Sequence, residues 1–200
     1  MSISESHTRY RLDAASNGMV MPPEDFDLIK DFDDEFCYEL VNGVVIVNSI
    51  PSEAESDPND ELGFLLRDYQ RNHPQGSVLD RTMPERYVHT RTGRRRADRV
   101  IWVGLGRVPD AQEDTPAIAI EFVSQSKRDR SRDYQEKTKE YREAGVQEYW
   151  GIDRFKRIVR VYHRDHREQV IAEGDVYRTD LLPGFELPLA RLFSIADNWQ

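Results

Sequence analysis

Two carboxylates, Asp98 and Glu121, stand within short segments that have the apolar character of buried strands. Asp98 opens the run 98–103 (DRVIWV), and Glu121 interrupts the run 117–123 (AIAIEFV). An ionised carboxylate that is buried without a partner costs several kcal/mol of stability. A divalent cation shared by both side chains would remove this cost. The pair therefore predicts a metal-dependent hydrolase, and among hydrolases it favours a nuclease.

Lys137 is the candidate third member of this site. Residues 129–144 have helical character, and Tyr134 and Tyr141 share one face of that helix because they lie seven positions apart. Lys137 falls between the two tyrosines on the same face. A lysine on an inward face either extends past its neighbours to water or pairs with a buried anion. Since the helix follows the strand of Glu121 directly, that anion could be Glu121 or a phosphate bound beside it.

These residue types match the requirements of phosphodiester hydrolysis. The reaction needs a cation that neutralises the non-bridging oxygens and lowers the pKa of a water molecule. Mg²⁺ prefers carboxylate and carbonyl oxygens and retains several waters, and Mn²⁺ is the alternative. Asp98, Glu121 and the main-chain carbonyl of Phe122 would form such an open shell. Lys137 would orient the attacking water or stabilise the charge that develops at phosphorus.

A purely structural ion cluster is the alternative to a metal site. In that arrangement Asp98 pairs with Arg96 or Arg99. Glu121 pairs with Lys137 in the same arrangement. Spacing alone favours this alternative, because two carboxylates and a lysine are a weak motif. The choice between the two therefore needs information beyond spacing.

Basic residues are unevenly placed along the chain. The net charge of −9 argues superficially against a nucleic-acid partner. However, most of the acidic excess falls within residues 1–90, and residues 91–200 are close to balance. Two basic clusters flank the candidate acids, and they either bind phosphate or form solvated loops. The first comprises Arg91, Arg94, Arg95, Arg96 and Arg99, and the second Lys127, Arg128, Arg130 and Arg132.

The periodicity of the chain indicates a mixed α+β (α/β) fold. A length of 200 residues suits one domain over residues 21–200, preceded by a loosely structured extension over residues 1–20. The pair Asn42-Gly43 between two apolar runs predicts a tight hairpin, and a polar loop containing prolines is expected over 49–59. Further helices are expected near 23–29 and at 60–72, 129–144 and 189–196, with strands at 38–41, 44–47, 77–79, 86–88, 98–103, 117–123, 148–152, 157–162 and 169–172.

The composition also indicates a compartment. Cys37 is the single cysteine, so no intramolecular disulfide can form, which agrees with a reducing compartment. We expect Cys37 to be a small, partly buried apolar residue. The apolar stretches are too short to span a membrane, and residues 1–18 lack the apolar core of a signal peptide. We therefore expect a cytoplasmic protein with no membrane partner.

A longer pattern connects the candidate residues. Lys137 is followed four positions later by Tyr141 and preceded four positions earlier by Asp133, between the acid at 121 and an aromatic strand. This pattern resembles the Uma-two family of predicted restriction endonucleases, a branch of the PD-(D/E)XK nuclease superfamily. The resemblance extends over about residues 22–195, and 121–150 is its most specific part. Its motifs are EFVS (121–124), GVQEYW (145–150), YELVNG (38–43), RADRV (96–100) and LPGF (182–185).

The resemblance implies a restriction-endonuclease-like core with a central mixed sheet flanked by helices, and a Mg²⁺-dependent endonuclease that acts on DNA. It implies that Asp98 and Glu121 bind the metal. Val123 occupies the position where the wider superfamily has its lysine, and Lys137 is then the replacement. Glu39 matches a further family acid, either an outer ligand or a structural residue. A homodimer is also implied, because many nucleases of this fold act as dimers.

Two departures from the family pattern keep other functions open. Ala97 replaces the proline that precedes the aspartate, and residues 53–57 (EAESD) lack the histidine that the family often has before its first core helix. The main alternative is a catalytically weak or inactive member that binds nucleic acid or a protein. An RNA-specific or structure-specific nuclease is a further alternative that these residues cannot separate from a DNA nuclease.

Overall fold

The computed structural model describes residues 10–123 and 136–199. The chain divides into two compact units: residues 1–50 with 91–95 form unit 1, and residues 51–90 with 96–200 form unit 2. Strands and helices occur together in both, so the predicted mixed α+β class is confirmed. The division into an extension over residues 1–20 and one domain over 21–200 stays a prediction.

Unit 1 is built around the predicted hairpin. Asn42 and Gly43 have φ angles of 51° and 78°, which are the positive values that a tight turn of this type requires. The hairpin strands β3 and β4 pair in antiparallel register, and β3 also pairs through Leu40 with Arg94. Cys37 is buried, as expected. The elements are β1 (Arg11–Leu12), η1 (Ala14–Ser16), α1 (Pro23–Asp27), β2 (Asp31–Phe32), β3 (Phe36–Val41) and β4 (Val44–Ser49).

Unit 2 contains a mixed sheet in the order β10-β9-β8-β7-β6, with β5 also paired to β6. Strands β7 and β8 are parallel, whereas β6 pairs with β7 and β9 pairs with β8 and β10 in antiparallel register. The strands are β5 (Leu79–His89), β6 (Arg94–Val103, which begins in unit 1), β7 (Ile118–Phe122), β8 (Glu148–Asp153), β9 (Ile158–His163) and β10 (Glu168–Ala172), beside the short pair β11 (Val176–Tyr177) and β12 (Leu187–Pro188).

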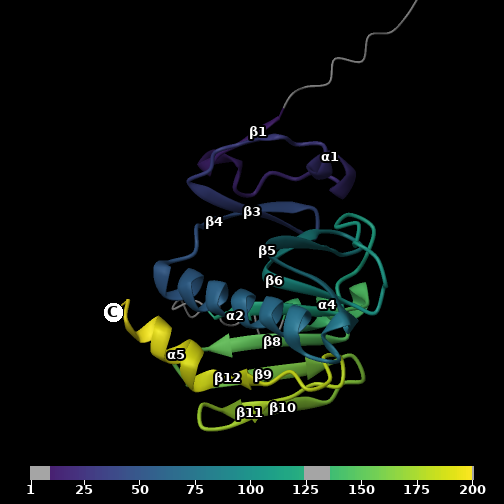
Figure 1. Ribbon diagram of the computed structural model, residues 1–200. Coiled ribbons are helices and arrows are strands. Elements are labelled where there is room, and N and C mark those ends of the chain that lie inside the picture. The colour runs from purple at the N-terminus through teal and green to yellow at the C-terminus, as the bar shows by residue number, and fades with distance from the viewer. Residues whose placement is uncertain (1–9, 124–135, 200) are drawn as a thin grey trace, which may run out of the picture. The chain divides into compact units, whose positions relative to one another are not determined.

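Helices pack on both faces of this sheet. On one face α2 (Glu53–Asn72) lies beside α5 (Leu189–Asp197), as Figure 1 shows, and their leucines pack with Ile118, Ile120 and Trp150. On the other face, α4 (Lys137–Ala144) contributes Tyr141 to a second core. That core contains Ala119 from β7 and Val100 and Trp102 from β6. Alternation along each strand therefore assigns every side chain in the sheet to one of two different environments.

Helix α2 begins earlier than the sequence pattern indicates, so the predicted loop over 49–59 is wrong for residues 53–59. The helix starts at Glu53, because Ser52 and Glu55 form a capping box at its N-terminus. Pro58 lies inside the helix, at its sixth residue, where it lacks the N–H that would otherwise bond to the carbonyl four residues earlier. Prolines in this segment had indicated a loop, whereas the capping box marks a helix start.

Three other predicted elements differ in extent. The two short strands expected at 77–79 and 86–88 are instead the 3-10 turn η2 (Gly76–Val78) and one long strand, β5. Glu85 has a positive φ of 52° within this strand. The helix expected over 129–144 is described as α4 and ends at Gly145, whose φ of 101° fits a helix C-cap. Residues 129–135 of that prediction, with Asp133 and Tyr134, lie outside the described residues.

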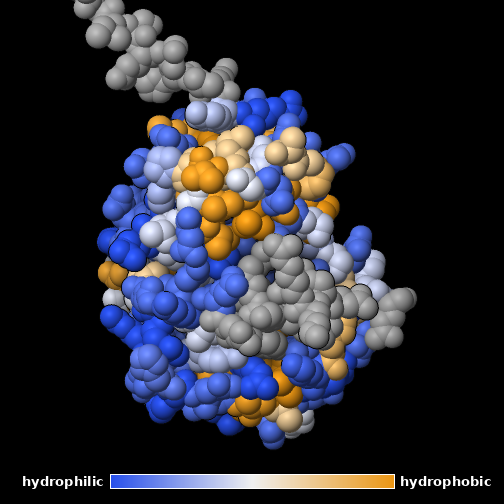
Figure 2. All heavy atoms as spheres, turned by 180° about the vertical axis from the view of Figure 1, so that it is seen from behind, coloured by the Kyte–Doolittle hydropathy of each residue, from blue (hydrophilic) through white to orange (hydrophobic). Residues whose placement is uncertain are grey.

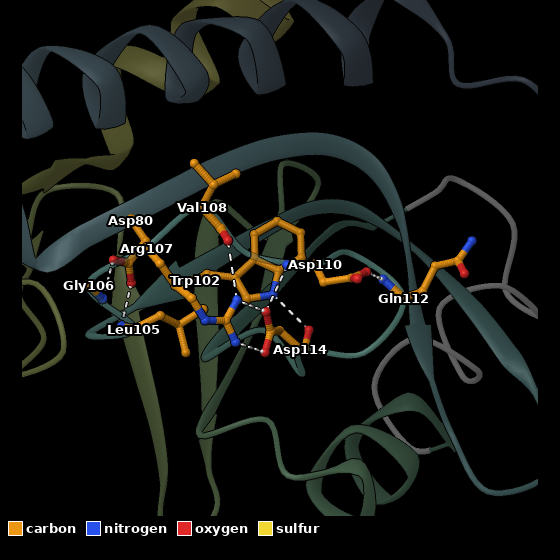
Figure 3. A network of polar contacts seen from close by, with 9 residues as sticks. All are labelled: Asp80, Trp102, Leu105, Gly106, Arg107, Val108, Asp110, Gln112 and Asp114. Atoms are coloured by element: carbon orange, nitrogen blue, oxygen red, sulfur yellow. Dashed lines mark hydrogen bonds and ion pairs between the residues drawn. The ribbon is translucent and has the colours of Figure 1, made fainter.

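The connection between β6 and β7 is ordered by polar contacts, which Figure 3 shows. The carboxylate of Asp80 accepts hydrogen bonds from the main-chain N–H groups of Leu105 and Gly106, at 2.7 and 2.9 Å. The indole Nε1 of Trp102 donates to the carbonyl of Asp114 at 2.8 Å. Arg107 also pairs with the carboxylate of Asp114 at 2.6 Å. Because this loop joins the strands of Asp98 and Glu121, its order helps to hold their register.

The face shown in Figure 2 is mainly hydrophilic, and its apolar atoms gather in patches near the top and the bottom of the view. The exposed apolar side chains include Val20 and Leu28 in unit 1, and Phe64 in unit 2. Among the described residues, no helix has the length and apolar character that crossing a membrane requires.

Candidate metal centre

Asp98 and Glu121 lie on adjacent strands and face the same side of the sheet. The antiparallel register of β6 and β7 pairs Arg99 with Ile120. Continued by one residue, this register places Asp98 opposite Glu121. Asp98 alternates with Val100 and Trp102, and Glu121 alternates with Ala119. All three of these apolar residues belong to the core under α4. The structure therefore brings both carboxylates to the face that α4 covers.

Asp98 and the main chain of Phe122 are in direct contact. The N–H of Phe122 donates a hydrogen bond to Asp98 Oδ2 at 2.6 Å. In an extended strand the N–H and C=O of one residue point to the same side. The carbonyl of Phe122 is thus directed to the side on which the Asp98 carboxylate lies. These oxygens are the ones that the sequence predicted as metal ligands together with Glu121.

Glu121 is buried and held by two donors from α4. Its Oε1 lies 2.7 Å from Nζ of Lys137 and accepts a hydrogen bond of 2.5 Å from the hydroxyl of Tyr141. Lys137 also donates to the main-chain carbonyl of Arg96, at 3.3 Å. Lys137 and Tyr141 share a helix face because they lie four residues apart, and both are buried. The inward lysine therefore meets a buried anion, and that anion is Glu121.

The electrostatics of the pair favour a cation. The pKa of Asp98 is raised well above its ordinary value, chiefly by removal from water and then by the negative charge of Glu121. Lys137 and the N–H of Phe122 oppose this rise. Lys137 thus offsets the repulsion between the carboxylates only in part. A second positive charge at this point would stabilise both in their ionised form.

The donor set fits a hard divalent cation. Two carboxylates and a main-chain carbonyl supply only oxygen, which Mg²⁺ and Mn²⁺ accept readily. Within the described ranges 10–123 and 136–199, no group of three or more His, Cys, Asp and Glu side chains could hold a metal ion. Among the residues that the structure describes, the carbonyl of Phe122 would be the further protein ligand of a cation at Asp98 and Glu121, beside water. Mg²⁺ commonly keeps several waters in this way.

The first basic cluster is used mainly for internal contacts. In unit 1, Arg94 pairs with Asp27 at 2.6 Å, and the buried Arg95 lies 3.7 Å from Glu39. Glu39 therefore has a structural contact within unit 1. In unit 2, Arg96 pairs with Glu85 at 2.6 Å. These contacts do not support a phosphate-binding role for Arg94–Arg96. The second cluster, at 127–132, lies outside the described residues.

Of the two ion pairs expected for a purely structural ion cluster, the structure shows one. Glu121 pairs with Lys137, as that alternative requires. Arg96 turns instead to Glu85, and Arg99 donates hydrogen bonds to Asn59 and Thr82. Asp98 is held by a main-chain N–H rather than by either predicted arginine.

Asn59 is a residue near the site that the sequence reasoning missed. Its side-chain Nδ2 donates to the main-chain carbonyl of Asp98 at 2.9 Å, and its Oδ1 accepts from Nε of Arg99 at 2.7 Å. Arg99 is itself buried and also donates to the carbonyl of Asn59 at 2.8 Å. The helix α2 is thereby fixed to the strand that carries Asp98. Only the buried, helical position of Asn59 could have indicated this, and the segment had been predicted as a loop.

Comparison with known proteins identifies the family. The model of the Uma2 family, described as "Putative restriction endonuclease", matches residues 23–190. The chain belongs to the Uma2 family. The resemblance deduced from the motifs of the sequence is thus confirmed. A search of curated proteins gave no match.

A solved structure confirms the fold of this Uma2 chain. It is a crystal structure described as "a putative nuclease belonging to DUF820", from Anabaena variabilis. The two are 17% identical with a TM-score of 0.68, and the match covers 88% of this chain and 99% of the other. The predicted restriction-endonuclease-like core is therefore confirmed. Membership of Uma2 supports a nuclease, and the roles of Asp98, Glu121 and Lys137 stay predictions.

Proposed function

We propose that this Uma2 protein is a Mg²⁺-dependent endodeoxyribonuclease in which Asp98, Glu121 and Lys137 form the active site. The observation that carries the proposal is the meeting of two carboxylates on one face of the sheet, beside the main chain of Phe122. Family membership and the fold support the same reading. Mn²⁺ is expected to replace Mg²⁺.

Each residue has a distinct task in this proposal. Asp98, Glu121 and the carbonyl of Phe122 would hold the cation. When bound, Mg²⁺ supplies charge neutralisation at the phosphodiester and lowers the pKa of a water molecule. Lys137 keeps its ammonium group on Glu121 at 2.7 Å, from where it would stabilise negative charge that develops at phosphorus. DNA is the proposed substrate, with RNA as the alternative.

Cleavage assays with matched variants test this proposal. Supercoiled, linear, branched and single-stranded DNA, and RNA, are incubated with the protein in Mg²⁺ or Mn²⁺. Asp98→Asn and Glu121→Gln should each slow cleavage roughly 100-fold or more, since removing one group that stabilises transition-state charge costs about 10²–10³ in rate. Glu143→Gln removes an exposed carboxylate of α4 and should leave the rate unchanged. Cleavage that survives both site substitutions would rule out this site.

A nucleic-acid-binding or protein-binding module is the second candidate. The neutralisation of Arg94, Arg95 and Arg96 by carboxylates within the chain favours its protein-binding form, because it leaves fewer charges for DNA. A net charge of −9 adds to this and weakens the attraction to phosphates. If no substrate is cut in either cation while a labelled duplex still binds, this second candidate replaces the nuclease.

A further inference from the structure

Two donors from one face of α4 converge on a single oxygen of Glu121. Nζ of Lys137 lies 2.7 Å from Oε1, and the hydroxyl of Tyr141 lies 2.5 Å from the same atom. Both side chains are buried, and Tyr141 is fully so. Hydrogen bonds to an ionised acceptor are among the strongest in proteins. These two contacts therefore hold Oε1 of Glu121 in place.

The ring of Tyr141 is itself fixed by aromatic packing. It meets the ring of Tyr149 edge-on, with centroids 5.3 Å apart, and Tyr149 stacks on Tyr162 at 5.5 Å. A ring held in this way cannot swing its hydroxyl away from Glu121 without disturbing the core under α4. Simple core packing accounts for the ring. It does not account for placement of the hydroxyl on a carboxylate that faces Asp98.

We propose that Tyr141 is a positioning residue for the metal centre. Together with Lys137 it holds Oε1 of Glu121, and so keeps this carboxylate in the place where it would share a cation with Asp98. Tyr141 touches neither cation nor substrate in this arrangement and acts through Glu121. The inference rests on the proposed function, since it requires that Asp98 and Glu121 bind a divalent cation.

The expected loss of metal affinity can be judged from other residues that hydrogen-bond to a metal ligand without binding the metal themselves. Removing a hydrogen-bonding group that orients a ligand typically lowers metal affinity or activity by about 10- to 100-fold. Tyr141→Phe deletes only the hydroxyl and keeps the ring against Tyr149. Tyr162→Phe is the matched control, because it removes a hydroxyl from the same aromatic stack without touching Glu121.

Calorimetric titration with Mn²⁺ in the absence of DNA is the test. The dissociation constant should rise by about 10- to 100-fold in Tyr141→Phe and stay unchanged in Tyr162→Phe. In cleavage assays the Mn²⁺ concentration for half-maximal rate should rise to the same extent, while the KM for DNA stays constant. Thermal unfolding in EDTA shows whether each variant keeps its fold without metal.

Each result has one meaning. Wild-type protein that binds no Mn²⁺ would overturn the proposed function and this inference with it. If the wild type binds Mn²⁺ and Tyr141→Phe binds it with equal affinity, only the inference is overturned, and the metal centre stays in place. Loss of folding of Tyr141→Phe in EDTA would likewise overturn it, because the hydroxyl would then serve the core rather than the metal.

Discussion

At the scale of single residues, Asp98 has the most informative environment. Its carboxyl is half-buried, accepts the N–H of Phe122, and has a raised pKa because of desolvation and the charge of Glu121. Burial and the charge of Glu121 therefore both oppose ionisation of Asp98. The raised pKa predicts a pH dependence of stability that can be measured without any substrate.

Asp98→Asn should change the pH dependence of stability. A raised pKa means that the folded state keeps the Asp98 proton at pH values where the unfolded chain, with an ordinary value of 3.8, has lost it. The unfolded state then binds fewer protons, so the free energy of unfolding falls as the pH rises above that ordinary value. The fall continues until the pH passes the raised pKa of the folded state.

Urea unfolding in EDTA across a series of pH values measures this effect. The wild type should lose more stability with rising pH than Asp98→Asn, whose amide can still accept the N–H of Phe122. Saturating Mg²⁺ should stabilise the wild type increasingly as the pH rises, because the ionised form binds the cation. Identical pH profiles for the two proteins in EDTA would show that Asp98 has no raised pKa.

Part of this site can be predicted from the sequence. Acids within apolar strands mark Asp98 and Glu121, and helical spacing places Lys137 on an inward face. The same spacing places Tyr141 inward, but the direction of its hydroxyl depends on how α4 sits over β7. The position of α4 over β7 is set by tertiary packing, and no local sequence pattern predicts it.

At the scale of elements, the contact between α2 and β6 supports the centre. Asn59 on α2 bonds both to the carbonyl of Asp98 and to the buried guanidinium of Arg99. The approach is close, since a Cβ on Gly63 would lie only 2.6 Å from Nη2 of Arg99. Burial lowers the pKa of Arg99 to about 10, so the arginine depends on these hydrogen bonds in place of water.

Asn59→Ala should be strongly destabilising. It removes the Oδ1 acceptor from Nε of the buried Arg99 and the Nδ2 donor from the carbonyl of Asp98, which costs about 2–4 kcal/mol of unfolding free energy. Asn72→Ala is the control on the same helix, because Asn72 is exposed and bonds only locally to Asp68. Urea unfolding of both variants measures the difference. Equal stability of the two variants would contradict a supporting role for Asn59.

The elements themselves are predictable to different degrees. The Asn42-Gly43 hairpin and the strands from β6 to β10 follow from turn chemistry and apolar runs. The start of α2 was missed because Pro58 was given more weight than the capping box of Ser52 and Glu55. The link from Asn59 to Arg99 spans 40 residues in sequence, and contacts of that range leave no local signal.

At the scale of the whole molecule, charge is the property that most constrains function. Much of the arginine cluster near the acids is occupied within the protein, and the chain carries a net charge of −9. Binding to DNA should therefore depend on the divalent cation more than on arginine side chains. Without the cation, we expect weak binding to a labelled duplex in fluorescence anisotropy. Equally tight binding in EDTA would contradict this expectation.

A cytoplasmic location and a homodimer stay predictions for the whole molecule. Sedimentation should give twice the chain mass of 23.4 kDa if two copies associate. A sedimenting mass equal to that of one chain would contradict the dimer and leave the metal centre unaffected, because Asp98, Glu121 and Lys137 all belong to unit 2 of one chain.

The most direct test of the account is whether one divalent cation binds between Asp98 and Glu121. Isothermal titration with Mn²⁺ measures its stoichiometry and affinity in the wild type, Asp98→Asn and Glu121→Gln. We predict one site per chain in the wild type and loss of that site in each variant. Binding that persists unchanged in both variants, or no binding in the wild type, would contradict the account.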